Sequence, residues 1–144
     1  MARIKIDLPD TFSFATTLAV RITDLNYGDH VGNDTVLSFI HEGRVRYLKS
    51  LGYAEFDMEG VGLIMADAAL IFKNEMYYGD ELIISIRAME FSRVGFDLIY
   101  KIEKKPAGLP LTLVALAKTT MVCFNYELKK LVPLPENAQT KLTL

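Results

Sequence analysis

The sequence predicts an α+β fold in which one long helix packs against an antiparallel β-sheet. Apolar residues recur at three- and four-residue spacing at about residues 34–51, which is typical of an amphipathic helix. Five other segments are predicted strands, because their apolar residues alternate with polar ones or form short runs between turn-forming residues. Successive strands with short connections pair antiparallel, and the helix must cover their apolar face.

The first strand is predicted at residues 12–22, where alternate residues are Phe, Phe, Thr, Leu, Val and Ile. This period of two is typical of a strand with one buried face. The polar, glycine-bearing segment 24–33 that follows is predicted to be an ordered loop before the helix.

The helix has recognisable ends in the sequence. Asn33 or Asp34 can cap its N-terminus, and Gly52 can end it. Gly43 lies on the apolar stripe, although a glycine costs about 1 kcal/mol in a helix relative to an alanine. Its position therefore predicts a close approach of the sheet at that point.

The remaining strands are predicted at residues 61–73, 82–89, 96–103 and 111–126. The first of them is nearly all apolar, as expected of a strand that is covered on both faces. One sheet and one helix cannot cover it twice, so we expect at least a homodimer, either a dimer or a dimer of dimers. The alternative is that the C-terminal tail, residues 127–144, covers this strand. We expect a single domain over residues 1–144, with its core at about 12–126.

Composition restricts the class of partner. Hydrophobic residues make up 51% of the chain, which excludes the disordered class. The net charge of −2 provides no excess of cations for a nucleic-acid backbone, so no nucleic-acid partner is expected. No apolar run approaches the ~20 residues of a membrane helix, and the N-terminus lacks the apolar core of a secretory signal. We therefore expect a cytoplasmic protein with no membrane partner.

Several motifs stand in a fixed order along the chain. The loop contains Asp24-Leu25-Asn26, His30-Val31 and Asn33, and the helix contains Phe-Ile-His-Glu-Gly-Arg at residues 39–44. Val-Gly-Leu-Ile follows at 61–64 and Tyr-Gly-Asp-Glu-Leu at 78–82. This order resembles the hot-dog-fold acyl-CoA thioesterases, a superfamily that includes 4-hydroxybenzoyl-CoA thioesterases and plant acyl-carrier-protein thioesterases. The resemblance covers about residues 12–126.

The resemblance implies a hot-dog fold, with one long central helix wrapped by a curved antiparallel sheet. It also implies hydrolysis of an acyl-CoA thioester to a free acid and CoA, with no cofactor apart from the coenzyme A of the substrate. The family pattern is Asp-x-Asp-x-x-Gly-His-Val-Asn-Asn, and its second aspartate is taken as the catalytic base or nucleophile. Asn26 stands at that position here, and Gly32 stands where the first asparagine of the pair would be.

The substitution by Asn26 leaves two functions open. An amide cannot be deprotonated to act as a base, although it can orient a water molecule or hydrogen-bond a carbonyl group. Either the chain hydrolyses thioesters with another base, or it binds acyl groups or acyl-CoA without turnover. A hot-dog dehydratase or hydratase is a third possibility, but it needs a differently placed histidine and acid.

His30 is the first candidate for the base. An imidazole titrates near pH 6.5 and can take a proton from water at neutral pH. His30 lies in a polar loop just before a helix N-terminus, where N–H groups at Gly32, Asn33 and Asp34 can stabilise negative charge on a thioester oxygen. Asp34 is interpreted as a cap or, alternatively, as the general base. His41, within the helix, is interpreted as a packing or surface residue.

Asp67 is the second acidic candidate, because it interrupts the apolar strand at 61–73. A buried carboxylate needs a partner or a raised pKa. A salt bridge to Arg44 or Arg46 is one explanation. In hot-dog dimers this strand lies near the helix start of the partner, so the other is that Asp67 reaches His30 across the interface.

The remaining candidates are predicted to bind substrate or to shape its site. Asp24 is interpreted as an acid that orients His30 or the loop. Ser92 and Arg93, in a predicted turn, are candidate ligands of the CoA phosphates. Cys123 is the only cysteine and is interpreted as a packed apolar thiol, and no metal site is predicted. The predicted substrate-binding residues are Asp24, Tyr27, Gly32, Asn33, Ser92 and Arg93.

Overall fold

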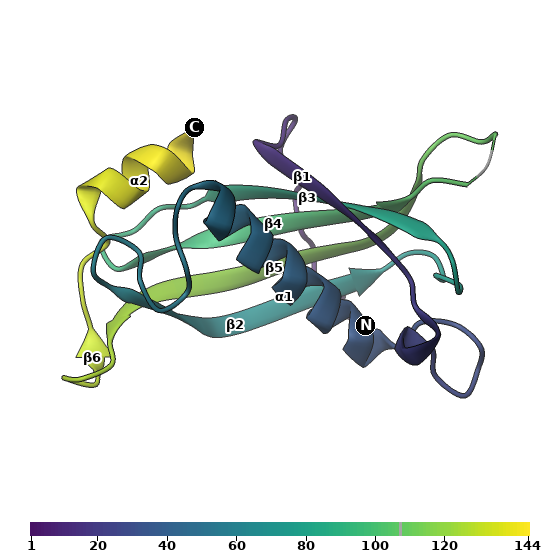
Figure 1. Ribbon diagram of the computed structural model, residues 1–144, viewed down its shortest axis with the longest axis horizontal. Coiled ribbons are helices and arrows are strands. Elements are labelled where there is room, and N and C mark those ends of the chain that lie inside the picture. The colour runs from purple at the N-terminus through teal and green to yellow at the C-terminus, as the bar shows by residue number, and fades with distance from the viewer. Residues whose placement is uncertain (107) are drawn as a thin grey trace.

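The computed structural model describes residues 1–106 and 108–144. Figure 1 shows helix α1 (Asn33–Ser50) lying across one face of a curved sheet. The other elements are β1 (Phe14–Ala19), the 3-10 turn η1 (Ile22–Asp24), β2 (Gly62–Phe72), β3 (Glu81–Met89), β4 (Gly95–Lys104), β5 (Thr112–Asn125), β6 (Lys130–Leu131) and α2 (Glu136–Thr143). The predicted α+β fold, a long helix wrapped by a curved antiparallel sheet, is confirmed.

The strand order of the sheet is β1-β3-β4-β5-β2, and β6 pairs with β5. All of these pairs are antiparallel. Ala19, the last residue of β1, lies opposite Glu81, the first residue of β3. The loop that follows β1 and the segment that precedes β3 therefore meet at the same end of the sheet.

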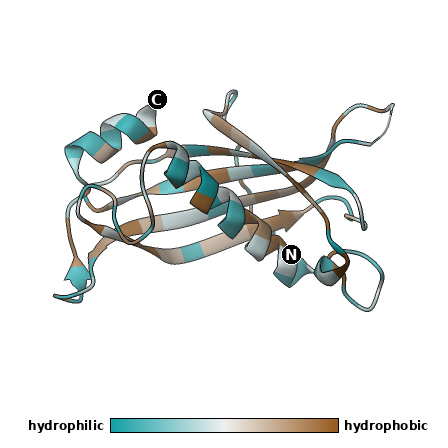
Figure 2. Cartoon of the chain, in the orientation of Figure 1, coloured by the Kyte–Doolittle hydropathy of each residue, from teal (hydrophilic) through white to brown (hydrophobic). Residues whose placement is uncertain are grey.

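Helix α1 packs on the sheet through its apolar stripe, which includes the buried Val36, Ile40 and Tyr47. A Cβ atom on Gly43 would lie 3.1 Å from Cγ2 of Ile84 and 3.2 Å from Cδ1 of Ile86, both on β3. These distances are short for carbon atoms, so the glycine permits the close approach predicted from its position. In Figure 2 the strands behind α1 are largely in hydrophobic colours, while several helix turns towards the viewer are hydrophilic.

The ends of α1 differ in how well the sequence predicts them. Gly52 ends the helix as expected: its φ is +85°, and its N–H donates to the carbonyl of Lys49. The prediction that Asn33 or Asp34 caps the N-terminus is wrong. The N-cap residue is Gly32, and no side chain caps the helix. A glycine has no side-chain acceptor, so the helix start keeps its N–H groups available.

The last four long strands begin and end within one residue of the predicted segments. The tail, in contrast, contains a helix that the sequence pattern did not predict. In α2 only Ala138 and Leu142 are buried, which is too few apolar positions for a recognisable stripe. The helix packs against β3, and Lys141 Nζ donates to the carbonyl of Leu51.

Strand β2 forms one edge of the sheet, since its only strand partner among the described residues is β5. Its middle is open to solvent, and Met65 is 41% exposed and Phe72 43% exposed. The alternative that the tail covers this strand is therefore wrong. The exposed middle of β2, residues 65–68, is therefore left uncovered by the described residues of the chain.

The segment before β1 runs along the face of the sheet away from α1. Residues 4–7 line a pocket together with Ala69 of β2 and Ile99 of β4. Arg87 of β3 donates to the carbonyl of Thr11, and Lys101 Nζ lies 4.9 Å from the ring centroid of Phe12. Among the described helices, none is long and apolar enough to cross a membrane.

Candidate active site

Hydrogen bonds within the chain order the loop between η1 and α1. The N–H of Asn26 donates to the carbonyl of His30 at 2.9 Å. The Asn26 side chain closes the intervening turn, because its Oδ1 accepts the N–H of Gly28 at 2.8 Å. The amide oxygen is therefore used inside the loop. Its Nδ2 is the part of the side chain left to contact a substrate or a water molecule.

The same loop orients the ring of His30. Nδ1 lies 3.1 Å from the carbonyl oxygen of Val31, and a carbonyl oxygen can only accept a hydrogen bond. Nδ1 therefore carries the hydrogen of the neutral ring, and Nε2 carries the lone pair. Nε2 lies 3.9 Å from Oε1 of Glu75, and the His30 side chain is 32% exposed. A partly exposed basic nitrogen of this kind can take a proton from water.

A pocket of about 220 Å³ opens beside His30. One wall is formed by the His30 loop and the first turn of α1, including Asn33 and Val36. The opposite wall is the segment 72–76, between β2 and β3. The backbone N–H of Val31 donates to the carbonyl of Met76 at 2.9 Å and so joins the two walls.

The start of α1 has free hydrogen-bond donors, and its residue Asn33 lines this pocket. Within the part of the chain that the structure describes, the N–H groups of Asn33 and Asp34 have no acceptor, whereas that of Thr35 donates to the carbonyl of Gly32. Free N–H groups at a helix start carry partial positive charge. They can stabilise an oxygen atom that becomes negative during a reaction.

Two glycines bring three of the predicted catalytic side chains together. A Cβ atom on Gly32 would lie 2.6 Å from Oδ1 of Asp34 and 3.6 Å from Cβ of Asn26. One on Gly28 would lie 3.2 Å from Oδ1 of Asn26 and 3.3 Å from Nε2 of His30. Asn26 is therefore next to His30 on one side and Asp34 on the other.

Asp24 holds the beginning of the loop. It is 6% exposed, and its carboxylate accepts the backbone N–H of Arg21 at 2.8 Å and the guanidinium of Arg21 at 3.2 Å. These contacts fix η1 rather than the His30 ring. Tyr27 lies fully exposed at the tip of the loop, so its predicted contact with substrate needs a ligand or another chain that extends over the loop.

The expectation that Asp67 is buried is wrong for the single chain. Its side chain is 61% exposed, and it pairs with Lys118 at 3.0 Å rather than with Arg44 or Arg46. The Thr120 and Lys118 side chains, which hydrogen-bond the carboxylate, hold the pKa of Asp67 below its ordinary value. Within one chain, Asp67 is not among the residues that line the His30 pocket.

Ser92 and Arg93 lie at the opposite end of the sheet from His30. They follow Met89, the last residue of β3, whereas the His30 loop lies beside the first residue of that strand. Nine strand residues correspond to roughly 25 Å. The structure therefore does not bring these two residues to the His30 pocket of the same chain, and their contact with CoA phosphates stays a prediction.

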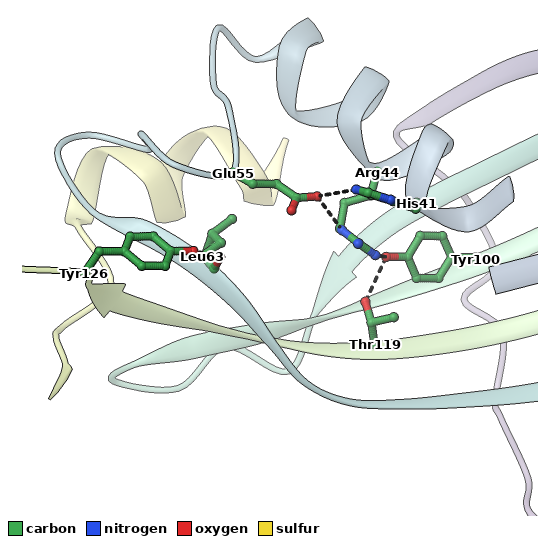
Figure 3. Close-up of polar contacts among 7 residues, drawn as sticks. All are labelled: His41, Arg44, Glu55, Leu63, Tyr100, Thr119 and Tyr126. Carbon is green, nitrogen blue, oxygen red and sulfur yellow. Dashed lines mark hydrogen bonds and ion pairs between the residues drawn. The ribbon is translucent and has the colours of Figure 1, made fainter. Parts of the chain in front are cut away.

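A second polar cluster lies between the C-terminal half of α1 and the sheet (Figure 3). Arg44 donates to Oε1 of Glu55 at 2.8 Å and to the hydroxyl of Tyr100 at 3.2 Å. Tyr100 also contacts Thr119, and His41 lies 3.7 Å from Glu55 at the surface. Burial raises the pKa of Tyr100, so the phenol stays neutral and this cluster holds the helix to the sheet.

Cys123 and possible metal ligands were the remaining candidates for chemistry outside the pocket. Burial raises the pKa of the Cys123 thiol to about 11, which keeps it in the unreactive thiol form at neutral pH. In residues 1–106 and 108–144, no group of three or more His, Cys, Asp or Glu side chains could hold a metal ion.

Glu75 is the pocket residue that sequence reasoning missed. It lies in a polar segment between two strands, and nothing in its spacing connects it with His30, 45 positions earlier. The pairing of β1 with β3 is the signal that could have revealed it. That pairing brings the segment before β3 beside the loop after β1.

Comparisons with known proteins agree with this fold. Residues 20–142 match the family model of the thioesterase-like superfamily. A curated 1,4-dihydroxy-2-naphthoyl-CoA hydrolase of Rippkaea orientalis is 26% identical over 124 residues, which cover 84% of this chain and 88% of that protein.

Two solved structures show the same fold. A 1,4-dihydroxy-2-naphthoyl-CoA thioesterase from Synechocystis has a TM-score of 0.79 and 23% identity, covering 90% of this chain and 94% of that chain. The second is a 4-hydroxybenzoyl CoA thioesterase, in the form of an aspartate-to-asparagine mutant complexed with 4-hydroxybenzoyl CoA. It has a TM-score of 0.82 and 16% identity, and the match covers 90% of this chain and 98% of that chain. Because the family model spans most of the sequence, from the end of β1 into α2, the chain belongs to the thioesterase-like superfamily.

Proposed function

We propose that this protein hydrolyses an acyl-CoA thioester to a free acid and CoA in the pocket beside His30. The observation that carries the proposal is that His30, with its lone pair on Nε2, lines a pocket together with Asn33, whose backbone N–H has no acceptor among the described residues. Hydrolysis of a thioester by water requires a base and a group that stabilises the oxyanion, both in the same pocket.

The reaction follows from this geometry. A water molecule attacks the thioester carbonyl carbon while Nε2 of His30 takes one of its protons. The N–H groups of Asn33 and Asp34 stabilise the negative charge that forms on the carbonyl oxygen. The carbon–sulfur bond then breaks, and the leaving thiolate of CoA takes the proton from His30. The acid product releases its own proton to solvent.

Three other side chains have roles in the proposal. Asn26 orients the water or the substrate through Nδ2, because its Oδ1 is used by Gly28. Asp34, beside Asn26, is the second candidate base. Asp67 acts on the pocket of a partner subunit, since it does not line the pocket of its own chain.

The proposal includes a homodimer at least, formed through β2. A long edge strand with unpaired backbone groups pairs with another chain unless it is blocked. β2 has 11 residues, and Met65 on it is 41% exposed. On the neighbouring flank of α1, Leu37 and Val45 are 37% and 44% exposed. A second copy would bury these apolar side chains, and a dimer of dimers is the larger form of the same proposal.

The alternative function is binding of acyl-CoA without turnover. Asn26, at the position of the family aspartate, favours it, as does the solved 4-hydroxybenzoyl CoA thioesterase mutant in which an asparagine replaces an aspartate and the substrate is bound. We propose a cytoplasmic location for either function, which fractionation of the source cells would test.

A panel of short, long and aromatic acyl-CoAs separates the two functions. Thiol release is measured for each compound, and binding is measured in parallel by calorimetry. We expect catalytic release of CoA from at least one class. Tight binding without thiol release across the whole panel would establish the alternative instead.

A further inference from the structure

The segment between β2 and β3 carries an acid that the motifs of the loop do not include. Met76 of this segment accepts the backbone N–H of Val31, so Glu75 and His30, their preceding neighbours, are held side by side. This hydrogen bond joins residues that are 45 positions apart in the sequence. The proximity of Glu75 to His30 is therefore set by the backbone and not only by two flexible side chains.

Further contacts hold the Glu75 side chain in one orientation. The hydroxyl of Tyr77 donates to Oε2 of Glu75 at 2.5 Å, and this carboxylate raises the pKa of Tyr77. Lys104 of β4 donates to the backbone carbonyl of Glu75 at 2.9 Å and lies over the ring of Tyr77. With Oε2 bound, Oε1 is the oxygen that faces Nε2 of His30, 3.9 Å away.

This arrangement places a negative charge opposite the nitrogen that must take a proton. Because Nδ1 of His30 donates to the carbonyl of Val31, only Nε2 can be protonated. The distance of 3.9 Å is too long for a hydrogen bond but short enough for charge attraction. An Nε2 that has taken a proton from water would therefore lie 3.9 Å from a carboxylate oxygen of opposite charge.

On the basis of the proposed hydrolysis, we propose that Glu75 is the positioning acid of His30, which itself acts as the base in place of the aspartate that Asn26 replaces. Glu75 stabilises the protonated ring during attack by water, and His30 then returns the proton to the CoA thiolate. Neither Asn26 nor Asp67 supplies a negative charge to His30 within the chain. Tyr77 and Lys104 fix Glu75 in the orientation that this role needs.

Other charged groups around the pocket bear on the same titration. Lys73 lines the pocket on the Glu75 side, and Asp34 lies at the start of α1. Asp29 is in the loop itself. Lys104 also pairs with Asp80 at 3.8 Å, which leaves part of its charge compensated. The variant that removes the charge of Glu75 therefore tests the effect of one charged side chain on His30, while the other positive and negative side chains stay in place.

The test compares Glu75→Gln, Glu75→Asp and the wild type by pH-dependent kinetics and by NMR of the histidine rings. The interaction between two solvent-exposed charges shifts the titration midpoint of either group by up to about 0.7 pH unit. We expect Glu75→Gln to move the acidic limb of the kcat/KM profile and the His30 resonances to lower pH by an amount in this range. We expect kcat to fall by up to about fivefold, while Glu75→Asp, which keeps the charge, restores most of both effects.

The chain provides two controls. It contains only two histidines, so the resonances of His41 report any general change in the variants. Glu59→Gln removes a surface carboxylate that also accepts a tyrosine hydroxyl, that of Tyr53, and should leave the His30 resonances in place. An unmoved His30 titration in folded Glu75→Gln, whatever its activity, would overturn the inference, as would equal effects of the Gln and Asp variants.

The NMR measurement also separates this inference from the proposed function. If the wild type hydrolyses no acyl-CoA but the His30 resonances still respond to Glu75→Gln, the pairing stands and the hydrolysis proposal fails. If the wild type is active and neither the kinetic profile nor the resonances respond, hydrolysis stands and the role of Glu75 is refuted.

Discussion

Gly32 determines how closely the polar side chains of the loop approach one another. Any larger residue would place a Cβ atom 2.6 Å from Oδ1 of Asp34, so Asp34 would have to move away from Asn26. The family pattern has an asparagine at this position, and the loop here differs in that respect. Asn26 and Gly32 are two of the positions at which this sequence departs from the family pattern. The sequence reveals both substitutions, but not that Oδ1 of Asn26 is already bound within the loop.

Cys123 gives a prediction at the scale of one residue. Burial raises the pKa of its thiol from 9.0 to about 11, so the folded protein keeps it protonated where an unfolded chain ionises it. Its contribution to the free energy of unfolding is complete below pH 9 and is lost as the pH rises from 9 towards 11. Denaturant titrations should be made at about pH 8 and about pH 10.5. Between these two pH values, the free energy of unfolding should fall further in the wild type than in Cys123→Ala.

A thiol reagent provides the control for this prediction. Folded protein at neutral pH should react slowly with it, and unfolded protein should react at once, because the reagent needs an exposed thiolate. Rapid reaction of the folded protein, or an equal loss of stability in Cys123→Ala, would show that burial does not control this thiol.

At the scale of elements, the sequence predicts what depends on local pattern. The alternation of apolar residues locates the strands, and the stripe with Gly43 locates α1 and its contact with β3. The N-cap is not predicted, because a nearby asparagine or aspartate is only one way to begin a helix. α2 is missed because two buried residues, Ala138 and Leu142, make too weak a pattern.

Strand β2 is the element whose surroundings the single chain leaves incomplete, and it gives the next prediction. Met65 pairs with the buried Met121, so its side chain lies on the same face of the sheet as α1. A charge there would be buried without a partner in a dimer formed through β2. We expect sedimentation to show a dimer or larger oligomer for the wild type and a monomer for Met65→Glu.

Leu128→Glu is the matched control for this change. Leu128 is 62% exposed in the turn between β5 and β6 and is not part of β2, so the same substitution should leave the oligomer intact. A monomeric wild type would refute the proposed dimer. An oligomer that survives Met65→Glu would place the interface elsewhere.

At the scale of the whole molecule, the pocket results from sheet topology. The antiparallel pairing of β1 with β3 brings the His30 loop beside the segment that carries Glu75. Motif spacing predicts His30, Asn26 and Asp34 because these residues lie close together in the sequence. It could not predict Glu75, which reaches the pocket only through the pairing of two distant strands. The apolar pattern of the strand at 61–73 predicted a buried Asp67, but in the single chain its side chain is 61% exposed.

The central claim is that His30 takes a proton from water in a pocket built by this topology. The most direct measurement is kcat/KM of His30→Gln, with the acyl-CoA that the wild type hydrolyses best. We expect a loss of roughly 10²- to 10⁴-fold, the usual contribution of a general base, with little change in acyl-CoA affinity. Hydrolysis by folded His30→Gln at a rate close to that of the wild type would contradict the account.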